Sequence, residues 1–378
     1  MNYTKTLEKN QKLTLRDQTV DNAKGLLILL FAVEHIFRNL PIVGGYAAYD
    51  LGKWFNHSEP GFPIVPWWGF NISDLAPVAF YALIGFVIYQ SFDKHFALAG
   101  KKAYKNHFIK NLAVTGLFLF TVFIQNQMTL SGAGETIFVR DLWTWNYLAG
   151  VGFTGILMLP FLTPLFRRNG FAGAAAKFAA GAVLLIAYNI LHDPLFSFLG
   201  AHSGQGGGPA ASFGFISVVL FAAGIKDIQG KTFRPKKETG NAFLTKLYEI
   251  IPYFAATVVF YVLGLLAANV LRLDTDYNTL GAPYIFTAFS KFQAIYFVFF
   301  ALNKFLWNGR AVPLLAAIGR NILLYIIIIT LAVAALGMFR GSLPQISFET
   351  GLALIPVPIA VCLVIAIPLE KKKVLFKL

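Results

Sequence analysis

The sequence is poor in charged residues and in cysteine. Only 13% of its 378 residues are Asp, Glu, Lys or Arg, whereas a typical soluble domain carries about a quarter. A soluble domain needs charge on its wetted surface, so this deficit excludes an ordinary soluble protein. The single cysteine, Cys362, lies in an apolar stretch. One cysteine excludes an intrachain disulfide and any metal site built from cysteines.

The sequence is rich in apolar residues. They make up 57% of the chain and fall in blocks of roughly 20 residues, the length that spans the hydrocarbon core of a bilayer. The 33 glycines fit a bundle of membrane helices, because glycine lets helices approach closely. The sequence therefore predicts an all-α polytopic membrane protein with about ten transmembrane helices, near residues 25–42, 72–92, 110–130, 145–166, 171–191, 209–226, 249–271, 283–303, 314–338 and 350–368.

The positions of the positive charges predict how this bundle is oriented in the membrane. A net charge of +14 would indicate nucleic-acid binding in a soluble protein, but Lys and Arg also mark the cytoplasmic loops of membrane proteins. With both termini in the cytoplasm, most of the 32 Lys and Arg residues fall on that side. We therefore expect no nucleic-acid partner, and three parts of the chain: a cytoplasmic N-terminal tail (1–23), a transmembrane domain (24–368) and a basic cytoplasmic tail (369–378).

The first predicted span carries ionisable groups at both ends. Such groups are costly in a bilayer, so each is a candidate functional residue. Lys24 lies at the cytoplasmic end, and Glu34 and His35 lie near the outer end, about 16 Å along the helix from Lys24. Neighbouring residues of a helix point about 100° apart, so we expect Glu34 not to partner His35. His35 is either a general base or a hydrogen-bonded packing residue.

The first outer loop and the span that follows supply further candidates. His57 lies in this loop and Asp74 begins the next span, after Trp67, Trp68 and Asn71. An aspartate bonded to a histidine ring would fix its tautomer, as a general base requires. Asp74 is equally well explained as a helix cap.

The remaining membrane-buried cations are candidates at the inner face. Arg320 begins an apolar span and, together with Arg310 and the basic loops, could receive an anionic cofactor. We expect Lys177 to extend toward the cytoplasm and Lys291, near mid-span, to need a partner or water. His95 and His107 are expected to be solvated. No grouping of histidines and carboxylates has the spacing of a metal site.

Several of these residues carry a family resemblance. The segment Val20-Asp21-Asn-Ala-Lys24-Gly25-Leu26, the loop histidine His57, and Trp67-Trp-Gly-Phe-Asn-Ile-Ser-Asp74-Leu together resemble the heparan-α-glucosaminide N-acetyltransferase family. Ile318-Gly319-Arg320-Asn321 with Tyr325 resembles a late Gly-x-Asn element of that family. Lys24 followed by His35 is also similar to the Arg-x10-His signature of the acyltransferase-3 family, with Lys in place of Arg.

The resemblance implies an enzyme that takes an acetyl group from cytoplasmic acetyl-CoA, its co-substrate, to a sugar amine or hydroxyl outside. His35 or His57 is then the catalytic histidine, with His35 favoured because a helix holds it, and Asp74 orients it. Lys24, Arg320 and Asn321 are the implied acetyl-CoA contacts. The implied acceptor contacts are Trp67, Trp68 and Asn71.

Two other functions stay open. Ionisable residues within spans also fit a proton-coupled secondary transporter, although no internal repeat is evident. A lipid-binding or assembly subunit is the third alternative. The expected acceptor is a carbohydrate or lipid-linked glycan at a bacterial plasma membrane. The oligomeric state, with a homodimer as one option, and the choice of N- or O-acylation are not decided by the sequence.

Overall fold

The computed structural model describes residues 18–43, 72–133, 145, 147–168, 170–199, 209–231, 242–273, 281–308, 310–339 and 342–372. These residues are almost entirely helical. The helices are α2 (Gln18–Asn39), α4 (Ile72–Ala99), α5 (Lys102–Ala133), α7 (Tyr147–Leu157), α8 (Phe171–Leu199), α9 (Ala211–Lys231), α10 (Ala242–Asn269), α11 (Ala282–Leu306), α12 (Pro313–Arg320), α13 (Ile322–Phe339), α14 (Phe348–Leu354) and α15 (Pro356–Lys371), with the short 3₁₀ helix η1 (Leu159–Leu162).

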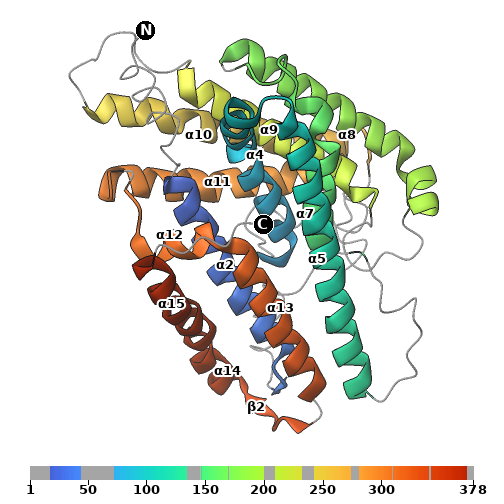
Figure 1. The fold of residues 1–378 in the computed structure, drawn as a ribbon, viewed down its shortest axis with the longest axis vertical. Helices are drawn as coiled ribbons and strands as arrows, with labels where there is room; N and C mark the ends of the chain where they lie inside the picture. The colour runs from blue at the N-terminus through green and yellow to red at the C-terminus, as the bar shows by residue number, and fades with distance from the viewer. Residues whose placement is uncertain are drawn as a thin grey trace.

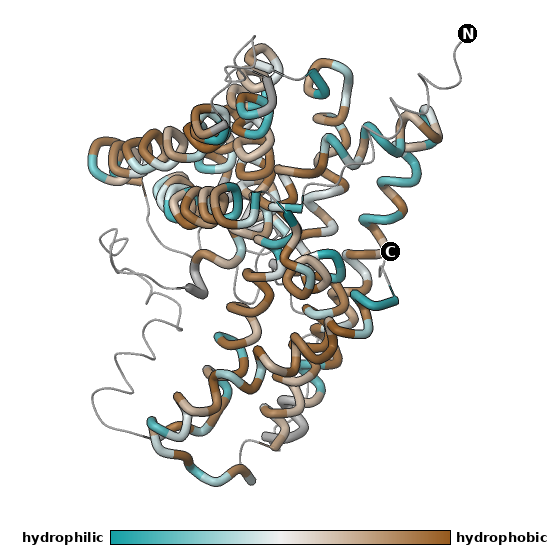
Figure 2. Tube along the Cα trace, turned by 90° about the vertical axis from the view of Figure 1, so that its left-hand side faces the viewer, coloured by the Kyte–Doolittle hydropathy of each residue, from teal (hydrophilic) through white to brown (hydrophobic). Residues whose placement is uncertain are grey.

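The helices confirm an all-α polytopic membrane protein. Within the described residues, eight helices are long and apolar enough to cross a membrane. Figure 2 shows apolar residues along most of the length of the helices. Each of the ten predicted spans falls on a helix or a helix pair, but α2 carries several ionisable groups and α7 is short. Ten crossings and the cytoplasmic position of both termini therefore stay predictions.

Three segments that the sequence predicts as single spans are divided, and the first of them, 145–166, consists of α7 and η1. The segment 314–338 is split into α12 and α13 at Asn321, and the segment 350–368 into α14 and α15 at Ile355. Pro356 follows Ile355 and cannot donate a backbone N–H to the preceding turn. The only strands among the described residues are β1 (Ile42–Val43) and β2 (Ile346–Ser347), which pair in parallel beside α14.

The helices pack around two apolar clusters. The aromatic cluster is formed mainly by α4, α8, α9, α10 and α11 and includes Phe86, Phe221, Tyr253, Phe289 and Tyr296. The α2 cluster is formed mainly by α2, α5, α7, α12, α13 and α15. In Figure 1, α10 and α11 run across the view, while α2, α5 and α13 extend toward its lower end. Helix α4 joins the two groups, because it packs against both α9 and α2.

Glycines allow the closest helix contacts. A Cβ on Gly85 of α4 would overlap the Val219 carbonyl oxygen of α9, and one on Gly152 of α7 would lie 2.5 Å from Oγ1 of Thr115 in α5. Lipid tails are as apolar as the helices, so the hydrophobic effect does not drive membrane helices together. Their association depends instead on this kind of close packing.

Candidate functional site

The two segments that carry the family resemblance pack directly against each other. Helix α12 lies across the N-terminal half of α2. A Cβ on Gly25 would overlap the carbonyl oxygen of Leu315, and a Cβ on Gly319 would overlap the carbonyl oxygen of Asp21 and lie 2.9 Å from the Gly25 nitrogen. Glycine is therefore required on both sides of this contact, because any side chain would separate the two backbones.

A network of amide and hydroxyl groups fixes the segment that leads into α12. Asn22 donates to the Arg310 carbonyl at 3.1 Å and accepts from the Val312 N–H at 3.0 Å. Asn303 of α11 donates to the same Arg310 carbonyl at 3.3 Å and accepts from the Thr19 hydroxyl at 3.0 Å. Asn22 and Asn303 are fully buried. Helices α2 and α11 thus hold the backbone of residues 310–312 in one position.

Three cations lie on the segments that form the α2–α12 contact: Lys24 on α2, Arg310 before α12 and Arg320 at the end of α12. Lys24 is half-buried on α2. Arg320 donates to the Glu370 carboxylate of α15 and to the Ala316 carbonyl, so its charge is already balanced. Arg310 is exposed, and its guanidinium has no ion-pair partner within the part of the chain that the structure describes. Of the two arginines, Arg310 is the one whose side chain is available to a ligand.

Asn321 lies at the break between α12 and α13. Its amide donates to the Ala317 carbonyl at 2.9 Å, and the residue is 1% exposed. Tyr325, on the next turn, donates to the Cys362 carbonyl of α15 at 3.1 Å. These contacts make Asn321 and Tyr325 part of the packing of α12 and α13 against α15.

His35 contradicts one prediction about its surroundings. Its Nδ1 lies in close contact with the Glu34 carboxylate, without hydrogen-bond alignment. The prediction that Glu34 does not partner His35 is therefore wrong. The glutamate side chain is long enough to reach the neighbouring residue although the two point about 100° apart. The His35 ring also packs against Phe31, with ring centres 3.8 Å apart and ring planes tilted by 40°. Glu34 itself is 2% exposed.

Five predicted site groups cannot be compared with this geometry. His57, Trp67, Trp68 and Asn71 lie outside the described residues. Asp74 lies in the first turn of α4, but its side chain is outside the described part as well. Whether these groups approach His35 stays a prediction.

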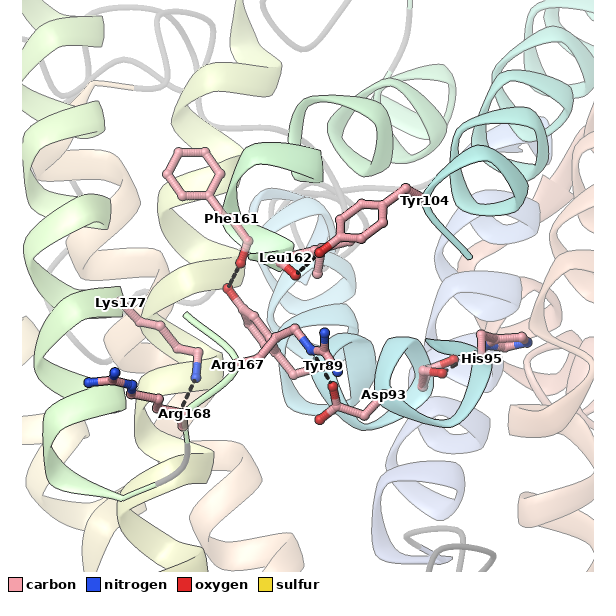
Figure 3. Close-up of polar contacts among 10 residues, drawn as sticks. Tyr89, Asp93, His95, Tyr104, Phe161, Leu162, Arg167, Arg168 and Lys177 are labelled. Atoms are coloured by element: carbon pink, nitrogen blue, oxygen red, sulfur yellow. Dashed lines mark hydrogen bonds and ion pairs between the residues drawn. The ribbon is translucent and has the colours of Figure 1, made fainter. Parts of the chain in front are cut away.

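A second polar group, which the sequence did not predict, joins α4, α8 and α9. Figure 3 shows Lys177 of this group with its bond to the Arg168 carbonyl. Lys177 is fully buried; it donates to the Asp227 carboxylate and, at 3.3 Å, to the Arg168 carbonyl. Its ammonium also lies 4.2 Å from the centre of the Tyr89 ring. The sequence predicts that Lys177 extends toward the cytoplasm; in the structure its ammonium is buried, because Asp227 supplies a counter-charge from the neighbouring helix.

Neighbouring contacts tie the same end of α4 to the segment after α7. Asp93 accepts from Arg167 at 2.5 Å, and the Arg167 guanidinium lies 4.2 Å from the Phe96 ring centre. The Tyr89 hydroxyl donates to the Phe161 carbonyl at 3.0 Å. Each charge here has a partner, so these residues connect helices rather than form a site for a ligand.

His95 and His107 differ in their surroundings. His95 is exposed, as predicted, and its Nδ1 lies 2.7 Å from the Ser91 carbonyl. His107 is half-buried, and its Nε2 lies 3.0 Å from the Gly155 carbonyl of α7. The prediction that His107 is simply solvated is therefore wrong. Lys291 is buried in α11.

The search for a metal site and the comparisons with known proteins add no evidence about the function. Within the described residues, no three His, Cys, Asp or Glu side chains lie close enough to hold a metal ion. No protein-family model matches the chain, and no curated protein matches it in sequence.

Proposed function

We propose that this protein is a membrane acyltransferase that moves an acetyl group from cytoplasmic acetyl-CoA to an amine or hydroxyl of an extracytoplasmic carbohydrate. The observation that carries the proposal is the contact between Lys24-Gly25 on α2 and Gly319-Arg320 on α12. Nearly 300 residues separate these motifs along the chain, yet glycines on both sides let their backbones touch. The segments that carry the resemblance to acyltransferases thus form one unit.

The donor end needs cations for the phosphates of acetyl-CoA. Arg310 and Lys24 supply them in the proposal, because Arg310 is exposed and its backbone is held by Asn22 and Asn303. A fixed backbone lowers the entropy lost when a side chain binds a ligand. Arg320 would have to leave Glu370 before it could bind a phosphate. This favours Arg310 over Arg320 as the phosphate contact.

The acceptor end needs a base. The acceptor N–H or O–H attacks the thioester carbonyl, its proton passes to a neutral histidine, the C–S bond breaks, and the CoA thiolate takes up a proton. His35 fits this role because Glu34 contacts Nδ1, which leaves Nε2 to accept the proton. Lys24 and His35 lie about 16 Å apart along α2, so one helix joins the donor end to the base.

The alternative function is a proton-coupled transporter. The buried Lys177–Asp227 pair between α8 and α9 favours it, because ionisable pairs within a membrane often mark a proton path. Release of free CoA separates the two functions, since a transporter produces none.

The test is turnover of acetyl-CoA by the full chain in lipid nanodiscs, with glucosamine as acceptor and free thiol as the readout. Wild-type protein should release thiol, and His35→Ala should reduce the rate by 10²- to 10⁴-fold, the usual effect of losing a general base. His57→Ala is made in parallel, because a loss confined to that variant would assign the base to His57. Absence of acetyl-CoA binding and of thiol release in the wild type would contradict the proposed function.

A further inference from the structure

Helix α5 packs into the bundle with one of its faces. His107, Asn111 and Phe118 lie on the packed face; the His107 ring contacts the Gly155 carbonyl of α7, and Phe118 belongs to the α2 cluster. The opposite face, which we call the outer face of α5, is formed by six exposed residues: Lys102, Lys105, Ile109, Leu112, Gly116 and Phe120. At about 100° per residue, these six lie within about 80° of one another. Figure 1 shows α5 along one edge of the bundle.

The outer face of α5 changes from basic to apolar along the helix. Its two lysines lie in the first turns, and the exposed residues that follow on this face are apolar. A Cβ on Gly116 would meet nothing within 4 Å, so the face has an open position between Leu112 and Phe120. The apolar part, from Ile109 to Phe120, is about 16 Å long, close to one leaflet of a hydrocarbon core of about 30 Å. The outer face thus has the charged end and the apolar length that one lipid molecule requires.

Two more lysines lie at the turn from α4 to α5. We call the four residues Lys94, Lys101, Lys102 and Lys105 the lysine corner. Within the part of the chain that the structure describes, none of the four has a hydrogen-bond or ion-pair partner for its ammonium group. Asp93 is the only carboxylate in the second half of α4, and α5 has none. Asp93 accepts from Arg167, so the lysine corner keeps its positive charge unbalanced by the described residues.

The turn that carries the lysine corner is held in one conformation. Gly100 has a φ of 57°, and its N–H donates to the Phe96 carbonyl at 2.8 Å. The rings of Phe92 and Tyr104 pack with their centres 4.9 Å apart and join the two helices. Leu98, on the last turn of α4, is 88% exposed. An exposed apolar side chain beside several lysines suits the boundary between headgroups and hydrocarbon, where both kinds of side chain find partners.

We propose that the lysine corner and the outer face of α5 together bind an anionic phospholipid. The ammonium groups bind the lipid phosphate, and an acyl chain lies along Leu112, Gly116 and Phe120. Charge complementarity selects this ligand, because a cluster of lysines next to a membrane span attracts anionic headgroups. The sequence predicts that this turn faces the cytoplasm, where anionic lipids give the leaflet its negative surface potential. The inference does not depend on acyl transfer.

A second copy of the chain is the competing occupant of the outer face. In a two-fold symmetric contact the same patch of both chains meets itself. Such a contact through α5 would bring Lys102 and Lys105 of the two chains close together, and like charges repel. The lysine corner therefore favours a lipid over a dimer at this face.

The experiment titrates the full chain in detergent micelles and measures bound lipid by native mass spectrometry. The probes are dioleoylphosphatidylglycerol, which is anionic, dioleoylphosphatidylcholine, which has no net charge, and glycerol 3-phosphate, a free phosphate without acyl chains. The test variant is Lys102→Gln with Lys105→Gln. Its control is Lys246→Gln with Lys304→Gln, which loses the same charge from lysines that already bind Asn308 and Glu249.

The wild type and the control should bind phosphatidylglycerol more tightly than phosphatidylcholine. The test variant should bind phosphatidylglycerol about 30-fold more weakly, at about fivefold for each lysine removed, and phosphatidylcholine as before. Equal affinities of the test variant and the control for phosphatidylglycerol would overturn the proposal. No preference for phosphatidylglycerol in the wild type would overturn it as well.

Two further outcomes identify other occupants. Displacement of phosphatidylglycerol by an equal concentration of glycerol 3-phosphate would assign the lysine corner to a free phosphate and overturn the lipid site. A wild-type dimer that binds no phosphatidylglycerol would assign the outer face to a second copy. Lys102 and Lys105 are exposed, so the test variant should unfold at the same temperature as the wild type. Thiol release is not the readout here, so failure of this proposal leaves the proposed function to its own test.

Discussion

Charged side chains beside the aromatic cluster differ in burial and pairing from those beside the α2 cluster. Beside the aromatic cluster, Lys177 is fully buried and is paired with Asp227 of the next helix. Beside the α2 cluster, the ion pair between Arg320 and Glu370 is about one-third exposed, and Arg310 is exposed and unpaired among the described residues. Lys177 and Asp227 hold two helices together out of contact with water, whereas the second region includes an exposed arginine without an ion-pair partner among the described residues.

Polar groups without charge also join helices in the aromatic cluster. In the aromatic cluster the Tyr253 hydroxyl donates to Gln229 at 3.0 Å and the Ser290 hydroxyl to the Thr257 carbonyl at 2.7 Å, so helices α9, α10 and α11 are joined by satisfied bonds. Buried side-chain groups without a hydrogen bond among the described residues occur in both regions: Thr154 on α7, and Ser212, Ser217 and Gln293 on α9 and α11.

The largest expected effect is on stability, in the aromatic region. Lys177→Met leaves the buried Asp227 carboxylate without its counter-charge, and breaking a buried pair in this way costs about 3–5 kcal/mol. Thermal unfolding in detergent, followed by tryptophan fluorescence, measures the loss. The double variant Lys177→Met with Asp227→Leu should recover most of it, because no uncompensated charge then remains. A single variant as stable as the wild type would show that this pair does not hold α8 and α9 together.

The next effect is expected at the contact between α2 and α12. Gly319→Ala should destabilise the protein by about 1–3 kcal/mol, as overpacking does, because the added methyl overlaps the Asp21 carbonyl. Gly116→Ala is the control, since its methyl meets nothing within 4 Å and should leave the unfolding temperature unchanged or slightly higher. Equal behaviour of the two variants would argue against a close approach of the two motifs.

The smallest effect is expected at Glu370. Its contact with Arg320 is partly exposed, so Glu370→Gln should change stability by less than about 1 kcal/mol. The Kd for CoA, measured by titration calorimetry in nanodiscs, should also stay the same if Arg310 is the phosphate contact. Tighter binding would mean that Glu370 competes with phosphate for Arg320, and that Arg320 is the true contact.

The sequence predicted the helices better than their contacts. Each predicted span falls on a helix because runs of apolar residues are read directly from the chain. The Lys177–Asp227 pair was missed because its partners are 50 residues apart and hydropathy does not say which helices are neighbours. The Glu34–His35 contact was missed because ideal helix geometry ignores the reach of a long side chain. The α2–α12 contact joins motifs that were noticed separately, and only the fold places them together.

The central claim is that the end of the bundle where α2 meets α12 binds the phosphates of an acyl donor through Arg310. The most direct test compares the KM of Arg310→Gln for acetyl-CoA with its KM for S-acetylpantetheine, which carries the same thioester without the nucleotide phosphates. Arg320→Gln serves as the control. The account predicts a KM for acetyl-CoA about tenfold higher in Arg310→Gln, the effect of about 1.4 kcal/mol of lost binding, with little change for S-acetylpantetheine. An equal change for both substrates, or no change for either, would contradict it.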